Sequence, residues 1–192
     1  MAIEIVYETH STTTDNEAGI ATGWLPGRLS ELGRRQAVEL GKRRRAEHFS
    51  AIHCSDLARA VETARLAFPD REPHQDPRLR ECNYGSLNGT SAAVIAGLRP
   101  LRLDEPYPGG GQSYREVVAA TAAFLTDLAA APGDDTDPGT DADPRRVLII
   151  AHSANRLALE HLLNGRALPE LLAADPVWQP GWHFTLPANW LP

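Results

Sequence analysis

The stretch Arg146-Val-Leu-Ile-Ile-Ala-His152 contains the clearest strand signal in this chain. An uninterrupted apolar run of this kind is typical of a strand buried on both faces of a parallel sheet. A histidine follows its last apolar residue. The run Ile3 to Glu8, rich in β-branched residues, predicts a second buried strand, which leads into His10. Phe49 to Cys54 predicts a third strand.

Helical patterns separate these strands. Ser30 can cap a helix whose apolar face includes Leu40 and whose opposite face is rich in arginine. Ser113 and Glu116 match a capping box, which marks the start of another helix. The expected helices cover residues 30–45, 57–67, 92–98, 113–131 and 154–164. Strands that alternate with helices predict a three-layer α/β/α sandwich with a mostly parallel central sheet, formed by a single domain over residues 1–192.

The remaining segments are expected to hold few regular elements. Residues 11–29 and 99–112 are rich in Gly, Pro and polar side chains, which indicates loops. Residues 132–145 (PGDDTDPGTDADPR) predict a mobile, acidic surface loop. The tail is expected to end in an edge strand near Trp182 to Leu186. Core packing explains the tail tryptophans more simply than a homodimer does, although a homodimer stays open; they are Trp178, Trp182 and Trp190.

The composition argues against several classes of protein. Of 192 residues, 42% are hydrophobic and 23% are charged, as in ordinary globular proteins. The formal net charge of −6 does not favour nucleic-acid binding, and no apolar run approaches the ~20 residues that cross a bilayer. The first residues do not resemble a secretory signal. The two cysteines, Cys54 and Cys82, form neither a CxxC pair nor a metal-binding spacing. We therefore expect a cytoplasmic protein with no nucleic-acid or membrane partner.

Polar side chains are expected to gather at one edge of the predicted sheet. Ligands of such sheets bind beyond the carboxyl ends of the strands, which is where His10 and His152 fall. One histidine there is more often structural, but two favour a shared site in which an imidazole acts as nucleophile, base or phosphate ligand. Arg59 lies early in the next helix, where a guanidinium suits an anion, although an exposed arginine is usually solvated. Glu81, in a segment without periodicity, is either a solvated carboxylate or part of a pocket.

These residues occur within a series of motifs that resembles the histidine phosphatase superfamily, the phosphoglycerate-mutase-like proteins. The family's opening Arg-His-Gly-Glu-Thr motif, with a following Asn, corresponds to Thr9-His10-Ser11-Thr12-Thr13 and Asn16. Further matches in the family's order are LSELGRRQA (29–37), SDLARAVETA (55–64), LRECNYGSLNG (79–89), PGGGQS (108–113) and VLIIAHSANR (147–156). The resemblance covers nearly the whole chain.

The resemblance implies a two-step phosphoryl transfer from a small phosphorylated substrate. His10 would attack phosphorus and form a phosphohistidine while Glu81 protonates the leaving oxygen, and Glu81 would then activate water. Arg59 and His152 would hold the phosphate oxygens, assisted by Asn16. Since the protein's own cations would neutralise the phosphate, no metal or organic cofactor is expected.

The sequence departs from the family pattern beside both histidines. Thr9 replaces the motif arginine, and Ser11 and Ser153 replace the glycines that follow the histidines. These hydroxyls are candidate phosphate ligands. Loss of a charged donor typically costs ~1.5–3 kcal/mol, which an arginine from another direction could offset. The candidates for that role are Arg28, Arg80 and Arg156.

The sequence leaves three functions open. The first is a phosphomonoesterase with an altered phosphate cradle, which the joint presence of the two histidines, the arginine and the glutamate favours. The second is an enzyme of the same fold with acid–base chemistry on a substrate without phosphate, such as an isomerase or lyase, which Thr9 and Ser11 favour. The third is a non-catalytic binding protein. A phosphoglycerate mutase proper is less favoured, because the chain is short and has Thr9 where the motif places arginine.

Aromatic side chains are candidates for contacts with the substrate. Residues 90–112 are expected to cover the site, with Tyr107 and Arg102 contributing to a partly aromatic lid. Tyr84 and Trp24 could stack on a ring, although packing is the simpler role, above all for Trp24.

Overall fold

The computed structural model describes residues 1–131, 145–175 and 179–191. Within these residues the main sheet has five strands in the order β4-β3-β6-β1-β7. The strands are β1 (Ile3–Thr9), β3 (Ala51–Cys54), β4 (His74–Gln75), β6 (Arg145–Ala151) and β7 (Trp182–Leu186). All pairings are parallel except that of β7, which lies antiparallel to β1 at the sheet edge, as the sequence predicts.

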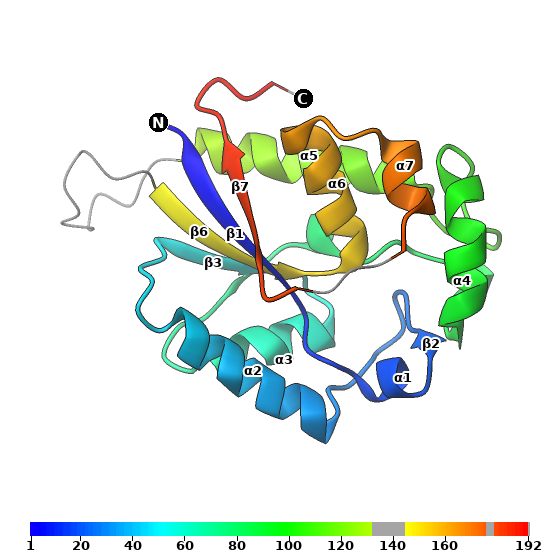
Figure 1. Cartoon of the computed structure of the whole chain (residues 1–192), viewed down its shortest axis with the longest axis horizontal. Helices are drawn as coiled ribbons and strands as arrows, with labels where there is room; N and C mark the ends of the chain where they lie inside the picture. The colour runs from blue at the N-terminus through cyan, green and yellow to red at the C-terminus, as the bar shows by residue number, and fades with distance from the viewer. Residues whose placement is uncertain (132–144, 176–178, 192) are drawn as a thin grey trace.

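Helices cover both faces of this sheet (Figure 1). On one face lie α5 (Tyr114–Ala130) and α6 (Ser153–Asn164), and on the other lie α2 (Glu31–Arg44) and α3 (Ala58–Ala67). This arrangement confirms the predicted three-layer α/β/α sandwich with a mostly parallel central sheet.

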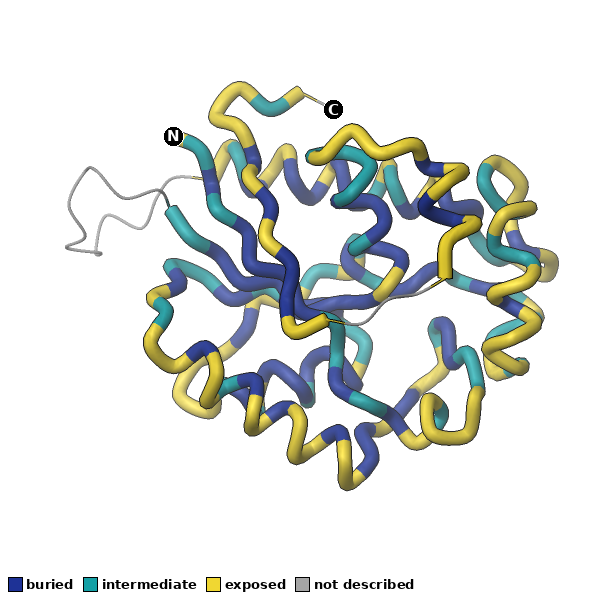
Figure 2. Tube along the Cα trace, in the orientation of Figure 1, coloured by how far each residue is buried: buried dark blue, intermediate teal, exposed yellow. Residues whose placement is uncertain are grey.

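The strands divide their side chains between two cores. Ile5 and Tyr7 of β1 pack in the cluster that contains Phe124 of α5. Val6, which points the opposite way because side chains alternate along a strand, packs in the cluster that contains Leu40 of α2. The middle of β1 and most of β6 are therefore buried on both faces, as the dark blue of Figure 2 shows. Burial of each such aliphatic side chain contributes roughly 1.5–3 kcal/mol to stability.

The register of β1 against β6 fixes the relative position of the two histidines. Thr9 lies opposite Ala151 in the parallel ladder. The next backbone N–H, that of His10, donates to the carbonyl oxygen of Ala151 at 2.9 Å. His10 and His152 therefore leave the sheet side by side at its carboxyl edge.

Two of the predicted helix starts are confirmed by their capping contacts. The Ser30 side chain accepts a hydrogen bond from the N–H of Gly33 at the start of α2. At the start of α5, Ser113 and Glu116 form the reciprocal capping box that their spacing predicts.

The segment 11–29 is more ordered than its composition predicts. It contains α1 (Thr14–Glu17) and β2 (Ile20–Ala21), and β2 pairs with β5 (Thr90–Ser91) in a small second sheet. Elements this short leave no periodic signal in sequence, because a two-residue strand is stabilised by its partner and not by its own pattern. The pairing of β2 with β5 places segment 11–29 against the start of α4 (Ala92–Leu98), a helix that the sequence does predict.

The structure also contains short elements that the sequence did not predict. The expected loop 99–112 opens with a 3₁₀ turn, η3 (Arg99–Arg102), and the tail contains an unpredicted helix, α7 (Leu168–Ala173). Two further 3₁₀ turns, η1 (Pro77–Leu79) and η2 (Gly85–Leu87), lie in the polar stretch before α4. Of the predicted mobile loop, Arg145 already belongs to β6, and residues 132–144 lie outside the described part of the chain.

A third apolar cluster joins the carboxyl edge of the sheet to α4 and α7. It includes Tyr84, Ile95, Tyr114, Leu157 and Leu172. In the tail, Trp182 and Trp190 pack on the main core, which is the predicted core role, whereas Trp178 lies outside the described residues. None of the helices in the described ranges has the length and apolarity that crossing a bilayer requires.

Candidate active site

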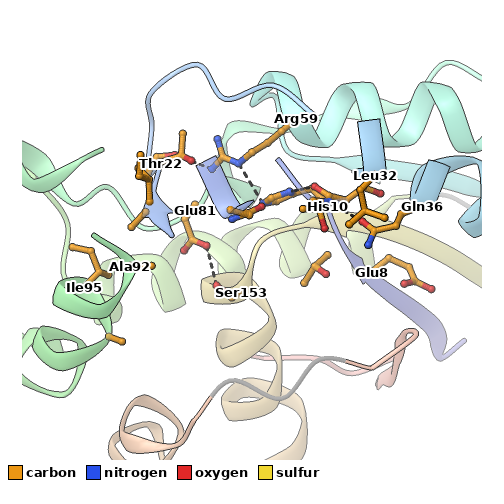
Figure 3. A pocket seen from close by; sticks show the side chains of 18 of the residues that line it. Glu8, His10, Thr22, Leu32, Gln36, Arg59, Glu81, Ala92, Ile95 and Ser153 are labelled. Carbon is orange, nitrogen blue, oxygen red and sulfur yellow. Dashed lines mark hydrogen bonds between the residues drawn. The ribbon is translucent and has the colours of Figure 1, made fainter. Parts of the chain in front are cut away.

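A cleft of about 870 Å³ opens at the carboxyl edge of the sheet (Figure 3). Its floor is formed by the end of β1 and by the starts of α3 and α6, and it extends on one side along α2 and on the other to α4. The predicted site residues that line it are Thr9, His10, Ser11, Asn16, Arg59, Glu81 and Ser153. His152, fully buried, lies directly behind, with its ring centroid 5.0 Å from that of His10.

The His10 ring is held in one tautomer. Its Nδ1 lies 2.8 Å from the carbonyl oxygen of Ser11, an acceptor, so Nδ1 carries the proton and Nε2 carries the lone pair. Nε2 accepts a hydrogen bond from Nε of Arg59 at 3.3 Å. Burial, with the neighbouring Arg59 charge, lowers the pKa of His10 from 6.5 to about 4. His10 is therefore neutral at pH 7, with Nε2 available as a nucleophile.

His152 differs from His10 in having no polar partner for its ring among the described residues. Both ring nitrogens are buried and unpartnered, whereas its carbonyl oxygen accepts a hydrogen bond from the buried Tyr7 hydroxyl. Burial lowers the pKa of His152 well below 6.5, with further contributions from Arg59 and His10. An unpartnered buried polar group is costly, roughly 1–3 kcal/mol, and this one lies beside the His10 ring.

Arg59 is buried in the first turn of α3 and contributes a second unpartnered group. Its Nη2 donates to the carbonyl oxygen of Gly23 at 2.8 Å, while Nη1 is buried without a partner in the described chain. Gly23 has a φ of +57°, and a Cβ there would lie 1.8 Å from Oδ1 of Asn88, so this carbonyl is presented by a turn that needs glycine. Because an unpartnered guanidinium N–H of Arg59 and the unpartnered His152 ring lie beside His10, the site is suited to an anion.

Glu81 is buried beside the histidines, and both of its carboxylate oxygens accept hydrogen bonds. Oε1 accepts from the backbone N–H of Cys82 at 2.8 Å and Oε2 from the Ser153 hydroxyl at 3.0 Å. The Trp24 indole N–H donates to the Glu81 carbonyl oxygen at 2.6 Å and so fixes the backbone. The Ser153 proton is thus directed at Glu81, which differs from the expectation that this hydroxyl binds phosphate.

Three further residues predicted to bind phosphate, Ser11, Asn16 and Thr9, also line the cleft. The backbone N–H of Ser11 is bonded to Thr63 Oγ1, one turn along α3 from Arg59. Oδ1 of Asn16 accepts from the N–H of Thr13 in the cap of α1, which directs its amide NH₂ away from that cap. Thr9 lines the cleft just before His10. Their roles as phosphate ligands remain predictions.

None of the three arginines predicted to replace the missing motif charge lines the cleft. Arg28 is exposed. Arg80 forms a two-pronged ion pair with Asp56 and stacks on Trp24, and Arg156 stacks on Trp182 at 5.2 Å. Sequence could not locate the guanidinium groups of Arg80 and Arg156, because each is held by a partner that only the fold brings near. The arginines that do line the cleft are Arg35, Arg43, Arg59 and Arg99.

The predicted lid is only partly correct. Ala92 and Ile95 of α4 line the cleft, as does Tyr84. Tyr107, however, is buried against Tyr84 with ring centroids 5.1 Å apart, and Arg102 stacks on Tyr107. Trp24 also lies outside the cleft lining, in the packing role that the sequence favours. The lid prediction was wrong for the loop residues, because they pack under α4 instead of over the site.

Several lining residues were not predicted. Leu32, Arg35, Gln36 and Arg43 on α2 form one side of the cleft. With Glu39, the lining positions 32, 35, 39 and 43 recur every three or four residues, which is the signal of a common helix face, but nothing in the sequence indicates that this face borders the site. Tyr114, which begins α5, lines the opposite side.

Comparisons with known proteins agree with this geometry. A model of the histidine phosphatase superfamily (branch 1) matches residues 9–174. Over 101 residues the chain is 33% identical to a 2,3-bisphosphoglycerate-dependent phosphoglycerate mutase from Streptococcus sanguinis, a match that spans 49% of this chain and only 44% of that relative. A mycobacterial glucosyl-3-phosphoglycerate phosphatase aligns at 29% identity and a TM-score of 0.75, over 90% of this chain and 84% of that one. The phosphoglycerate mutase of Bacillus anthracis, at 19% identity and a TM-score of 0.71 over 85% of this chain and 81% of that one, shares the fold.

Proposed function

The chain belongs to the histidine phosphatase superfamily, whose members include phosphatases and mutases, and from that premise we propose that it is a phosphomonoesterase that uses a phosphohistidine intermediate. The observation that carries the proposal is the state of His10. Its Nδ1–H is bonded to the Ser11 carbonyl oxygen, which leaves Nε2 as the nucleophilic atom at the floor of the cleft.

Two buried groups support a phosphoryl group at this position. Nη1 of Arg59 and both ring nitrogens of His152 lack partners among the described residues. Equatorial phosphate oxygens, which are acceptors, would satisfy Nη1 of Arg59 and the single N–H of the neutral His152 ring, and this stabilisation grows as negative charge shifts during transfer. A substrate without an anionic group would leave them unpartnered, which disfavours the isomerase or lyase alternative.

The reaction balances with Glu81 as the acid and base. In the first step, which Glu81 must enter as the protonated acid, the Nε2–P bond forms and the P–O bond breaks while Glu81 gives its proton to the leaving oxygen and becomes the carboxylate. In the second step water attacks phosphorus, the Nε2–P bond breaks, and Glu81 takes the proton of that water. Inorganic phosphate leaves, and both side chains return to their first states.

Hydrolysis is favoured over mutase chemistry by the charge at the site. A mutase must keep a substrate with a second anionic group bound during the lifetime of the phosphoenzyme. Binding that second anion requires cations near the nucleophile. This chain has Thr9 where the family motif has arginine, and the three substitutes considered lie outside the cleft. Of the arginines that do line the cleft, Arg43 is paired with Glu8 and Arg99 donates to two backbone carbonyl oxygens. The similar mycobacterial protein, 29% identical, is a phosphatase.

The proposal is tested by phosphate release over a broad panel of phosphomonoesters, for the wild type and for His10→Ala. Release that requires His10, with a phosphoenzyme detected by mass spectrometry after acid-free quenching, supports the proposal. Transfer of phosphate from 2,3-bisphosphoglycerate to phosphoglycerate at a rate above hydrolysis would assign a mutase instead. A folded wild type that is silent on the whole panel and binds no phosphate would overturn the proposal.

A further inference from the structure

The two sides of the cleft differ in chemistry, and this difference bears on the substrate. We propose that the alcohol part of the substrate is predominantly apolar, an alkyl or aryl group, and that it lies between the Glu81 carboxylate and α4. The inference rests on the proposed function, since it uses the direction in which the leaving group departs.

That direction follows from the positions of the nucleophile and the acid. In-line attack places the leaving oxygen on the side of phosphorus opposite Nε2 of His10, and Glu81 must reach that oxygen to protonate it. In Figure 3, Ala92 and Ile95 lie on the Glu81 side of the cleft, whereas Leu32 and Gln36 lie on the His10 side. The leaving alcohol therefore extends towards α4 and away from α2.

The walls on the α4 side are mostly apolar, and the Thr22 hydroxyl, which lies on the same side in Figure 3, already donates to Asp15. Tyr84, Ile95, Tyr114 and Leu157 line the cleft and belong to one buried apolar cluster, each no more than 6% exposed. Ala92 extends this surface along α4. Burial raises the pKa of Tyr84 and of Tyr114 well above 10, so both phenols are neutral and add no charge.

Charged groups are concentrated at the other side or already have partners. Arg35, Glu39 and Arg43 line the α2 side of the cleft. On the α4 side the lining arginine is Arg99, and its Nε and Nη2 donate to the carbonyl oxygens of Leu172 at 2.8 Å and Ala174 at 2.6 Å. A leaving group with a carboxylate or a second phosphate would have to compete with these two carbonyl oxygens for the Arg99 guanidinium. An alkyl or aryl group would instead gain from burial against the apolar walls.

The test measures binding separately from turnover. Ethyl-, butyl- and hexylphosphonate cannot be hydrolysed, and their affinities can be compared by calorimetry. We expect affinity to rise roughly two- to fourfold per added methylene until the wall is filled, and 3-phosphoglycerate to bind more weakly than butylphosphonate. Equal affinity across the three phosphonates, or tighter binding of 3-phosphoglycerate, overturns the inference whether or not the protein is a phosphatase.

A matched pair of variants locates the effect. Ala92→Asn introduces an amide into the α4 wall, while Ala93→Asn makes the same change one residue on, at an exposed position outside the cleft lining. We expect Ala92→Asn to reduce the gain from ethyl- to hexylphosphonate several-fold and Ala93→Asn to leave it as in the wild type. The same loss in both variants would mean that the alkyl group binds elsewhere. Hydrolysis of the corresponding alkyl phosphates, followed by phosphate release, tests the proposed function alone.

Discussion

The ends of β1 and β6 occupy equivalent places in the fold, yet the histidines that follow them are held in different ways. His10 donates through Nδ1 to a carbonyl oxygen and accepts at Nε2 from Arg59. His152 has no ring partner within the described residues and is fully buried. A place at a strand end therefore brings each histidine to the site, whereas the hydrogen bond at Nδ1 leaves the lone pair on Nε2, the state that a nucleophile needs.

The strongest way to break this comparison is to remove each histidine and ask where phosphate becomes attached. We expect His10→Ala to lose activity by on the order of 10⁴-fold or more, as for removal of other covalent nucleophiles, and to form no phosphoenzyme. Rapid-quench mass spectrometry of the variant measures this. A phosphoenzyme that persists in His10→Ala would assign the attack to another residue.

His152→Ala is expected to have a smaller effect of a different kind. Losing a charge-stabilising donor costs about 10²–10³-fold in kcat, but His10 remains, so a phosphoenzyme should still form, more slowly. Single-turnover kinetics separates slow formation from no formation. If His152→Ala forms none while His10→Ala does, the roles assigned to the two histidines are reversed.

The lowered pKa of His10 predicts a dependence of stability on pH. In the unfolded chain this ring takes up a proton as the pH falls through 6.5, but in the folded chain it does so only near 4. The unfolded state therefore binds more protons between these values, and the free energy of unfolding decreases as the pH falls from 6.5 towards 4. Between pH 7 and pH 5, the wild type should lose about 2 kcal/mol more than His10→Gln. Urea unfolding at the two pH values measures the difference, and equal losses would contradict the burial of a neutral ring.

The residues beside His10 and His152 that differ from the family motif allow a comparison in which smaller effects are expected. Thr9→Arg restores the charge of the family motif before His10 and is expected to raise phosphate affinity about tenfold, the gain typical of a hydrogen bond from a charged donor. Inhibition of hydrolysis by inorganic phosphate measures this affinity. The control is Thr12→Arg, three residues further along in the segment between β1 and α1 and also at the cleft lining; an equal gain there would point to general electrostatic attraction.

Ser153→Gly restores the family residue after His152 and is expected to have the smallest effect. Because the Ser153 hydroxyl donates to Oε2 of Glu81, its loss should change kcat a few-fold, the range of one neutral hydrogen bond, with phosphate affinity unchanged. Measuring both kcat and the inhibition constant of phosphate distinguishes an effect on turnover from an effect on phosphate binding. A change in phosphate affinity alone would restore the original expectation that Ser153 contacts phosphate.

Much of the scaffold could be predicted from local patterns. The apolar run before His152 and the β-branched run before His10 are strong because strands buried on both faces must be apolar throughout. Ser30 and Ser113 were recognisable as caps because capping uses residues within the first turn of the same helix. The β2–β5 pair and α7 were missed because each is short and depends on contacts with distant segments.

The features of the candidate site likewise fall into those that the sequence could predict and those that it could not. The sequence by itself determined that His10 and His152 meet at one edge of the sheet, since parallel strands present their carboxyl ends together, and the motif resemblance added Arg59 and Glu81. Only the tertiary structure decided that the hydroxyl of Ser153 serves Glu81, that Arg80 and Arg156 are held by Asp56 and Trp182, and that the α4 side of the cleft is mostly apolar. The physical reason is range: strand and cap signals arise between near neighbours, while side-chain partners separated by tens of residues are chosen by packing.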